Sequence, residues 1–468
     1  MPPYLALFLW LIFVLGLLRF DPAREHSPSM ALWVPLIWMF IVGSRLPSQW
    51  LGVDMDVSAS QAFEEGNALD RTILAFLILI AFGILVSRIF NWGGFFARNF
   101  ALLIFLLFAL MSFMWSDFPL VALKRWFRDL GGYLVILVVL TDPRPLEAIR
   151  TLLRRLCFLL IPLSILVIKY FPGTGRMYEF WSGTPMYVGA TTSKNMLGVA
   201  CLVSGIYFFW DTVTRWPDRK DLRTKRAIYV NVLLILMTFW LLSLANSATS
   251  KICLAMGCLV IAAAHTKLFR RYPGFLKVMI PVTVCVYMVL EFGFGISGQM
   301  AEMVGRNATL TGRTDLWKLL LTMHTNPIVG TGYESFWLGP RLEWIWRNFT
   351  YVNEAHNGYL EIYLDLGFIG LFLLMIMLIA YYRGICRGLS SRSPLATLSL
   401  ALWTVLIFYN MTEAAFKGSQ LIWLTFLLAA IVVPERALNQ ATDAVPLDGV
   451  GNRDRFRHLP FEPTTFGR

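Results

Sequence analysis

The stretch NEAHNGYLEIYLDLGFIGLFLLMIMLIAYY, residues 353–382, decides the fold. It opens with several polar and ionisable groups and then becomes almost wholly apolar. An apolar run of about 20 residues is long enough to cross a bilayer as a helix. We therefore predict a transmembrane helix over residues 358–382, with an ionisable cluster at its mouth.

Similar apolar runs recur from one end of the chain to the other. Of the 468 residues, 57% are hydrophobic and only 15% are charged, whereas a soluble globular protein carries about 25% charged residues. The composition predicts an all-α polytopic membrane protein with 12–13 transmembrane helices, because the second and ninth runs are short. The predicted spans are residues 4–18, 31–45, 72–90, 99–115, 128–141, 155–171, 194–211, 228–245, 250–264, 275–293, 358–382, 395–412 and 418–434.

The net charge of +12 would suggest a nucleic-acid partner in a soluble protein. Here much of the excess lies in short loops between apolar runs, so membrane topology explains it better and no nucleic acid is expected. Loops rich in Lys and Arg stay in the cytoplasm. If the spans alternate, the basic loops share the cytoplasmic side with a polar, disordered tail at 435–468. These basic loops are residues 142–155, 215–226, 266–277 and 382–392.

The opposite, outer side holds the longest loop, residues 294–357, between a bundle of ten spans at 1–293 and three more at 358–434. This loop contains an amphipathic segment, because four apolar residues follow one another at helical spacing. They are Leu316, Leu319, Leu320 and Met323. Thr311 or Thr314 can cap the start of this helix, and Asn326-Pro327 ends it. We predict a small helical lid on the outer face of the bundle.

Several cations lie on this outer side, where the charge rule disfavours them: Lys124, Arg125, Arg128, Lys194, Lys251, Arg306, Arg313, Lys318, Arg341 and Arg347. Two interpretations stay open, namely binding of an anionic ligand and snorkelling to lipid headgroups. Arg313 is the clearest candidate, since a cation in the first turn of a helix opposes the helix dipole. It could clamp a phosphate or diphosphate beside free backbone N–H groups, or form an ion pair with Asp315 or another loop acid.

His356 lies just before the eleventh predicted span, at the edge of the membrane. Its imidazole can accept a proton near neutral pH, although a lone interfacial histidine can also be structural. Asn357 beside it can orient a ligand, and Glu361 and Asp365 one turn apart can pair with basic residues or hold a cation. No metal-binding motif and no nucleotide-binding motif is present, and the six cysteines are expected to be small buried hydrophobes.

Aromatic residues crowd the outer segments 176–187 and 334–349. Trp and Tyr normally gather in belts at membrane interfaces. The alternative is that they stack on the apolar faces of sugar rings.

The motifs TLTGRTDLW, NPIVGTGYESFW and NEAHNGYLEIYLDLGFIGLFLL follow one another in the outer loop and the span after it. Together with WSDFPLVALKRW and TTSKNMLG upstream, their order and spacing resemble the O-antigen ligase/polymerase family of Wzy-like and WaaL-like membrane glycosyltransferases. Within that family, the chain looks most like exopolysaccharide polymerases of the ExoQ type.

The resemblance implies a GT-C-like bundle and transfer of a glycan from undecaprenyl diphosphate in the bacterial inner membrane, on its periplasmic face. It implies no metal and no cofactor. His356 and Arg313 would be catalytic, with Lys194 and Asn195 matching a KN motif. Lys251 stands where the family has an arginine in an SR pattern, so its role is open. Arg125 and Asn357 complete the predicted set of substrate-binding residues.

The sequence thus predicts an outer-leaflet polymerase that joins lipid-linked repeat units, is inverting and needs no metal. Its expected partners are the undecaprenyl-diphosphate-linked oligosaccharide and the lipid bilayer, with a chain-length regulator and a flippase as further candidates. Three alternatives remain. A ligase would use a lipid A-core or protein acceptor, a flippase or transporter would move the same lipid-linked glycan, and a scaffold protein would need none of the cations.

Overall fold

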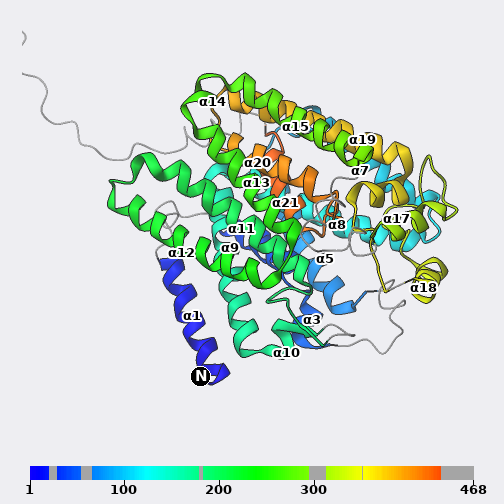
Figure 1. Cartoon of the computed structure of the whole chain (residues 1–468), viewed down its shortest axis with the longest axis horizontal. Helices are drawn as coiled ribbons and strands as arrows, with labels where there is room; N and C mark the ends of the chain where they lie inside the picture. The colour runs from blue at the N-terminus through cyan, green and yellow to red at the C-terminus, as the bar shows by residue number, and fades with distance from the viewer. Residues whose placement is uncertain (20–28, 54–65, 179–182, 295–312, 350, 434–468) are drawn as a thin grey trace, which may run out of the picture.

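The computed structural model describes residues 1–19, 29–53, 66–178, 183–294, 313–349 and 351–433. Helices dominate this part of the chain (Figure 1). The strands in it, β1 (Arg176–Tyr178) and β2 (Pro185–Tyr187), form one antiparallel pair. This strand pair, which the sequence did not predict, lies in the outer connection between two long helices.

The helices follow the chain in this order, and several short ones cap or connect the long ones. They are α1 (Pro3–Arg19), η2 (Met30–Leu32), α2 (Trp33–Gly43), α3 (Pro47–Leu51), α5 (Ala68–Val86), α6 (Trp92–Arg98), α7 (Phe100–Met111), η3 (Ser112–Met114), α8 (Pro119–Leu140), α9 (Pro145–Tyr170), α10 (Pro172–Gly175), α11 (Lys194–Arg215), η4 (Trp216–Asp218), α12 (Leu222–Ala245), α13 (Ala248–His265), α14 (Lys267–Arg271), α15 (Pro273–Phe294), α17 (Arg313–Thr322), α18 (Gly339–Asn348), α19 (Gly358–Ser390), α20 (Ala396–Tyr409) and α21 (Leu421–Ala430).

Among the described residues, six helices are long and apolar enough to cross a membrane: α5, α9, α11 extended by η4, α12, α13 and α19. The pair α6 and α7, bent by 86°, passes the same test as one broken span. Five shorter apolar helices accompany them. Each predicted span overlaps a helix, and the prediction of an all-α polytopic membrane protein is confirmed.

Helix α11 lies at the centre of the bundle and packs against α9, α12 and α13. Its outer end approaches that of α13 closely, because α11 carries Gly198 at the contact. A Cβ at this position would lie only 2.5 Å from Ser250 Oγ on α13. The first turns of two spans are therefore held side by side on the outer face.

The predicted lid exists as two helices rather than one, α17 and α18, which share a small core of their own. Leu316 and Leu320 are buried in that core, as their spacing predicts, and Met323 packs against it. Helix α17 begins at Arg313, so Thr314 lies inside the helix and does not cap it. The other proposed cap, Thr311, lies outside the described residues.

The chain that follows α17 is bonded to a break in α19. Gly367 has φ +65°, a left-handed conformation that glycine adopts without strain. Its backbone runs so close to Ile328 that a Cβ would lie 2.3 Å from the Ile328 carbonyl carbon. At this break the backbone N–H of Phe368 donates to the Pro327 carbonyl at 2.8 Å. The predicted continuous span 358–382 is thus interrupted where the lid segment crosses it.

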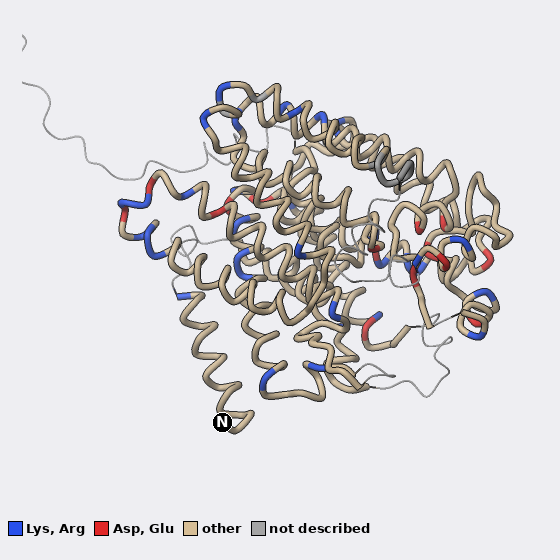
Figure 2. The backbone as a smooth tube through the Cα atoms, viewed as in Figure 1, with Lys and Arg blue, Asp and Glu red and all other residues tan. Residues whose placement is uncertain are grey.

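Charged residues gather toward both sides of the view in Figure 2, around α17 and α18 at the right and around the basic 215–226 connection at the left. Much of the bundle between them is free of charged side chains. In Figure 1, α14 lies on the same side as the α11–α12 connection and away from α17. This arrangement agrees with basic loops on one side and the lid on the other.

Candidate functional site

The candidate site forms where the outer ends of several spans meet the loop between α20 and α21. The backbone N–H of Gly358, the first residue of α19, donates to the carbonyls of Asn410 at 2.8 Å and Glu413 at 3.0 Å. In the first turn of α13, Thr249 Oγ1 lies 2.9 Å from Thr412 Oγ1. The starts of α13 and α19 therefore converge on residues 410–413.

Two further helix starts reach the same loop through side chains. Arg313, the first residue of α17, donates to the Thr412 carbonyl and pairs with Glu413 Oε1 at 3.0 Å. From the first turn of α11, Asn195 Nδ2 donates to both carboxylate oxygens of Glu413, at 3.1 and 3.2 Å. Four helix N-termini thus surround one buried carboxylate. Each brings the positive end of a helix dipole, which favours a negative charge there.

His356 completes this cluster from the turn before α19. Its Nδ1 lies 2.9 Å from Glu354 Oε1 and 3.5 Å from Glu413 Oε2. The backbone of His356 has φ +49°, which is uncommon for a residue with a side chain and often marks functional sites. With Nδ1 facing two carboxylates, Nε2 is the nitrogen that remains for a ligand.

The two acids set the protonation state of the imidazole. Burial alone would lower the pKa of His356, but its contacts with Glu354 and Glu413 outweigh burial and raise the pKa to about 9. Burial likewise opposes ionisation of Glu354, yet the contact with His356 and the nearby charges of Lys417 and Arg313 hold its pKa below the usual value. The resting cluster therefore contains an imidazolium between two carboxylates at neutral pH.

A second layer of bonds fixes the turn that carries His356. Glu361 on α19 accepts from the backbone N–H of Ala355 at 2.9 Å and from Trp337 Nε1 at 3.0 Å, both at Oε2. Its other oxygen pairs with Lys417 Nζ at 2.6 Å. The predicted pairing of Glu361 with a basic residue is confirmed. Asp365 instead accepts from the Phe336 backbone N–H at 3.2 Å.

The structure brings some of the predicted site residues together and leaves others at the edge. His356, Arg313 and Asn195 meet at Glu413. Lys194 is exposed at the start of α11. Lys251 is exposed at the start of α13, where its Nζ donates to Asn246 Oδ1 at 3.2 Å.

Asn357 and Arg125 take other places. Asn357 is the N-cap of α19, and its side-chain oxygen accepts from the backbone N–H groups of Tyr359 and Leu360. Its described role is thus to start the helix beside His356. Arg125 lies apart from Glu413 and donates to the Glu334 carbonyl at 2.6 Å. It lines a separate cavity.

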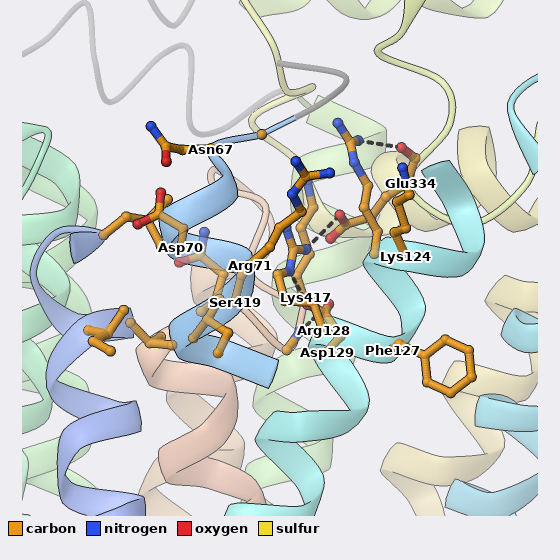
Figure 3. Close-up of a pocket in the computed structure, with 18 of the residues that line it drawn as sticks. Asn67, Asp70, Arg71, Lys124, Phe127, Arg128, Asp129, Glu334, Lys417 and Ser419 are labelled. Carbon is orange, nitrogen blue, oxygen red and sulfur yellow. Dashed lines mark hydrogen bonds and ion pairs between the residues drawn. The ribbon is translucent and has the colours of Figure 1, made fainter. Parts of the chain in front are cut away.

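That cavity has a volume of about 1260 Å³ and lies among α2, α5, α8 and the loop between α20 and α21 (Figure 3). Glu354, the partner of His356, lines it, as do Lys417 and Glu361. On the α8 side, Arg128 pairs with Glu334 at 2.8 Å and with Asp129 at 2.8 Å. The cavity therefore borders the catalytic candidate through the carboxylate that holds it.

Glu354, His356 and Glu413 also have the composition of a metal site. Their potential ligand atoms lie within 4.8 Å of one another, and two carboxylates with an imidazole can bind a divalent cation. In this arrangement, however, Arg313 and Asn195 already occupy Glu413. A cation would have to compete with the guanidinium and with the proton on His356, so these residues fit a metal poorly.

Sequence reasoning missed the residues that organise the cluster, namely Glu354, Glu413 and Lys417. One signal was available, because Glu413 and Lys417 are two charges in a short outer turn between two apolar spans. Alternating spans place that turn on the same side as His356. Nothing in the sequence says that Glu413 would reach Arg313, which is 100 residues away along the chain.

Comparisons with known proteins agree with this reading of the fold and site. Residues 230–375 match the family described as O-antigen ligase. The chain is also 29% identical over 297 residues to the exopolysaccharide production protein ExoQ of Rhizobium meliloti (strain 1021). That similarity covers 61% of this chain and spans 65% of the length of the relative. The resemblance to the O-antigen ligase/polymerase family, of the ExoQ type, is confirmed. The family match contains Arg313 and His356, whereas Glu413 lies beyond it.

Proposed function

We propose that this protein is an outer-leaflet glycan polymerase. It transfers a glycan from undecaprenyl diphosphate to a sugar hydroxyl of another lipid-linked repeat unit. The observation that carries the proposal is the meeting of Arg313 and His356 at Glu413, where four helix N-termini converge. This arrangement offers a cationic place for a diphosphate beside a group that can take a proton.

The donor diphosphate lies against Arg313 and the helix starts. Free backbone N–H groups at helix N-termini bind phosphate oxygens, and a guanidinium can pair with them through two parallel bonds. Arg313 keeps Glu413 as a second partner, so its position is fixed before the substrate arrives. The exposed Lys194 and Lys251 stand at two of the same helix starts and add positive charge around the diphosphate.

The transfer step forms one bond and breaks one. The acceptor hydroxyl oxygen attacks the anomeric carbon of the donor sugar, and the bond from that carbon to the diphosphate oxygen breaks. The hydroxyl proton passes to Nε2 of neutral His356, whose Nδ1–H faces Glu354. The electron pair of the broken bond leaves on the diphosphate. Attack from the face opposite the leaving group inverts the anomeric configuration.

Charge stabilisation supplies the rest of the catalysis. Fixed donors aimed at a developing charge in a site shielded from water are usually the largest single contribution to rate. Here Arg313 and the helix dipoles meet the charge that grows on the departing diphosphate. Diphosphate is a good leaving group, so the reaction needs neither a general acid nor a metal ion at the leaving oxygen.

The location and partners follow from the same proposal. The site faces the periplasm, and the protein lies in the bacterial inner membrane as a multi-pass bundle. A flippase would deliver the repeat units to the outer leaflet, and a chain-length regulator would act on the growing polymer.

A ligase is the second candidate, because the matched family carries the description O-antigen ligase. A ligase would use the same donor and the same residues but a different acceptor, a lipid A-core or a protein. Lys251 favours the polymerase, because it stands where the family pattern has an arginine and lacks the forked guanidinium.

Deletion of the gene separates these functions. Lipid-linked glycans are extracted from the deletion strain and sized by mass spectrometry. Single repeat units on the carrier, exposed on the outer leaflet, are the expected result. Long polymers retained on the carrier would indicate a ligase, and single units trapped on the inner leaflet would indicate a flippase. Unchanged lipid-linked glycans, in a strain without a redundant enzyme, would contradict the proposal.

A further inference from the structure

The cavity among α2, α5 and α8 has walls of two kinds. Toward the outer ends of the helices it is lined by cations: Arg45, Arg71, Lys124, Arg125, Arg128 and Lys417. Deeper along the same helices it is lined by apolar side chains, among them Ile41, Leu74, Ile78 and Phe127. The cavity is therefore polar at the membrane surface and apolar within the membrane.

Most of these cations already have partners. Arg128 and Lys417 pair with Glu334 and Glu361, and Arg45 donates to the Thr191 carbonyl at 2.8 Å. Arg71 and Lys124 differ. Neither has an ion pair or hydrogen bond to any residue that the structure describes, and both side chains are exposed.

These two cations stand at matching depths on neighbouring helices. Arg71 is in the first turn of α5 and Lys124 in the second turn of α8, and these two helices pack together. Figure 3 shows Arg71 and Lys124 at the same level of the cavity, with Phe127 further along α8. A group with two or more negative charges could lie between them while an apolar chain extended past Phe127 toward the membrane interior.

Isoprenoid diphosphate has this form, a compact anionic head on a long apolar tail. The cavity reaches Glu354, so a glycan attached to that head would extend toward His356. Arg313 serves the diphosphate that leaves in the transfer step, and it does not line this cavity. The molecule therefore has two separate cationic places on either side of His356.

We propose that the cavity is a second lipid-diphosphate site, which holds the acceptor by its own isoprenoid diphosphate between Arg71 and Lys124. The inference rests on the proposed function, because only a polymerase that joins two lipid-linked units needs two such sites. It explains how one protein holds both substrates on the outer leaflet. It also explains why the cavity cations are exposed rather than neutralised.

The test counts bound lipids. The purified full chain is placed in detergent micelles with undecaprenyl diphosphate as the probe, and native mass spectrometry measures how many lipids stay bound. The wild-type chain should bind two. The double variant Arg71→Ala/Lys124→Ala should bind one, and the charge-preserving variant Arg71→Lys/Lys124→Arg should bind two.

Two further variants make the result specific. Arg313→Ala should also bind one lipid, because it removes the donor site and leaves the cavity. Lys220→Ala, an exposed lysine in the basic connection before α12, is the matched control and should bind two. Excess phosphatidylglycerol tests a phospholipid as the occupant, and it should not displace either lipid.

Each contrary outcome identifies what failed. One bound lipid that is lost in Arg313→Ala would overturn the second site and leave the proposed function standing. Two lipids still bound to Arg71→Ala/Lys124→Ala would also overturn the second site, as would displacement of one lipid by phosphatidylglycerol. No bound lipid in the wild-type chain would count against the proposed function itself.

Discussion

Two acids in this molecule gather cations in the same way and in different surroundings. Asp211 Oδ2 accepts from Arg154 and Arg215, each at 2.8 Å, and from Asn231 at 2.9 Å. Glu413 accepts from Arg313 and Asn195 and faces His356. Both carboxylates are buried, with 0% and 5% of the residue exposed.

The difference lies in the backbone that carries each cluster. The residues around Asp211 all sit within the long helices α9, α11 and α12, where helix packing fixes them. The residues around Glu413 sit on a loop and on helix starts, and His356 has a left-handed backbone. Helix starts offer unpaired N–H groups to a ligand, and helix interiors do not. An ion-pair cluster within helices thus stabilises the bundle, whereas one at helix starts can bind a substrate.

The largest effect expected from this contrast is on the histidine. His356→Ala should reduce polymer synthesis by about 100- to 10,000-fold, the usual contribution of a positioned acid or base. In vitro turnover of a lipid-linked repeat unit, at equal amounts of folded protein, measures it. His265→Ala is the matched control, since His265 contacts only its own helix, at the Ile261 carbonyl. Near-normal turnover in His356→Ala would rule out His356 as the base.

Arg313 should follow with a somewhat smaller effect. Arg313→Ala should lower kcat by about 100- to 1,000-fold, because it removes a preorganised donor from the developing charge on the diphosphate. Arg313→Lys should recover only part of the rate, since lysine lacks the forked geometry. Arg347→Ala, which breaks an exposed ion pair on α18, should leave kcat unchanged. Equal rates for the wild type and Arg313→Ala would remove Arg313 from the mechanism.

The Asp211 cluster should show the opposite response. Asp211→Ala leaves Arg154 buried without its partner carboxylate, and breaking a buried pair typically costs about 3–5 kcal/mol. Thermal unfolding in detergent should therefore shift to lower temperature. Turnover per folded molecule should stay unchanged. A loss of turnover without a loss of stability would mean that Asp211 takes part in function.

The pH dependence should be set by the two acids around His356. The base form of His356 exists only above its pKa of about 9, so kcat/KM should rise with pH through neutrality and level off near pH 9. Glu413→Gln removes one of the carboxylates that raise this pKa. The plateau should therefore begin at a lower pH in that variant. A wild-type profile that falls with rising pH would mean that the imidazolium, not the neutral ring, is the active form.

Metal removal should have the smallest effect. Glu354, His356 and Glu413 stand close enough to bind a cation, but Arg313 and Asn195 already occupy Glu413. Treatment with EDTA should therefore leave turnover unchanged. Activity that disappears with EDTA and returns with one divalent metal would convert this cluster into a metal site.

Much of the fold was predictable because membrane spans are written in long apolar runs. Each predicted span overlaps a helix, and Leu316 and Leu320 face the core of the lid as their spacing requires. The break at Gly367 was not predictable, because periodicity alone does not show that another backbone crosses the helix there. The same holds for the strand pair β1–β2, which forms in a short aromatic loop.

The candidate site was predictable only in part. The residues that stand in recognisable motifs, His356, Arg313 and Asn195, meet in space. Glu413 carries no motif and sits on a loop far along the chain, and only the packing of four helix starts makes it the centre of the cluster. Asn357 shows the converse, because its place in a motif suggested a ligand contact and its side chain caps α19.

The central claim is that this chain joins lipid-linked repeat units by transfer from a diphosphate carrier. The most direct measurement supplies the purified protein, in lipid nanodiscs, with a single lipid-linked repeat unit and follows the products by mass spectrometry. The account predicts longer lipid-linked glycans together with one free undecaprenyl diphosphate per bond formed, with no added metal and none of either product for His356→Ala. Repeat units that remain single with the wild-type protein, at natural substrate and pH 8–9, would contradict it.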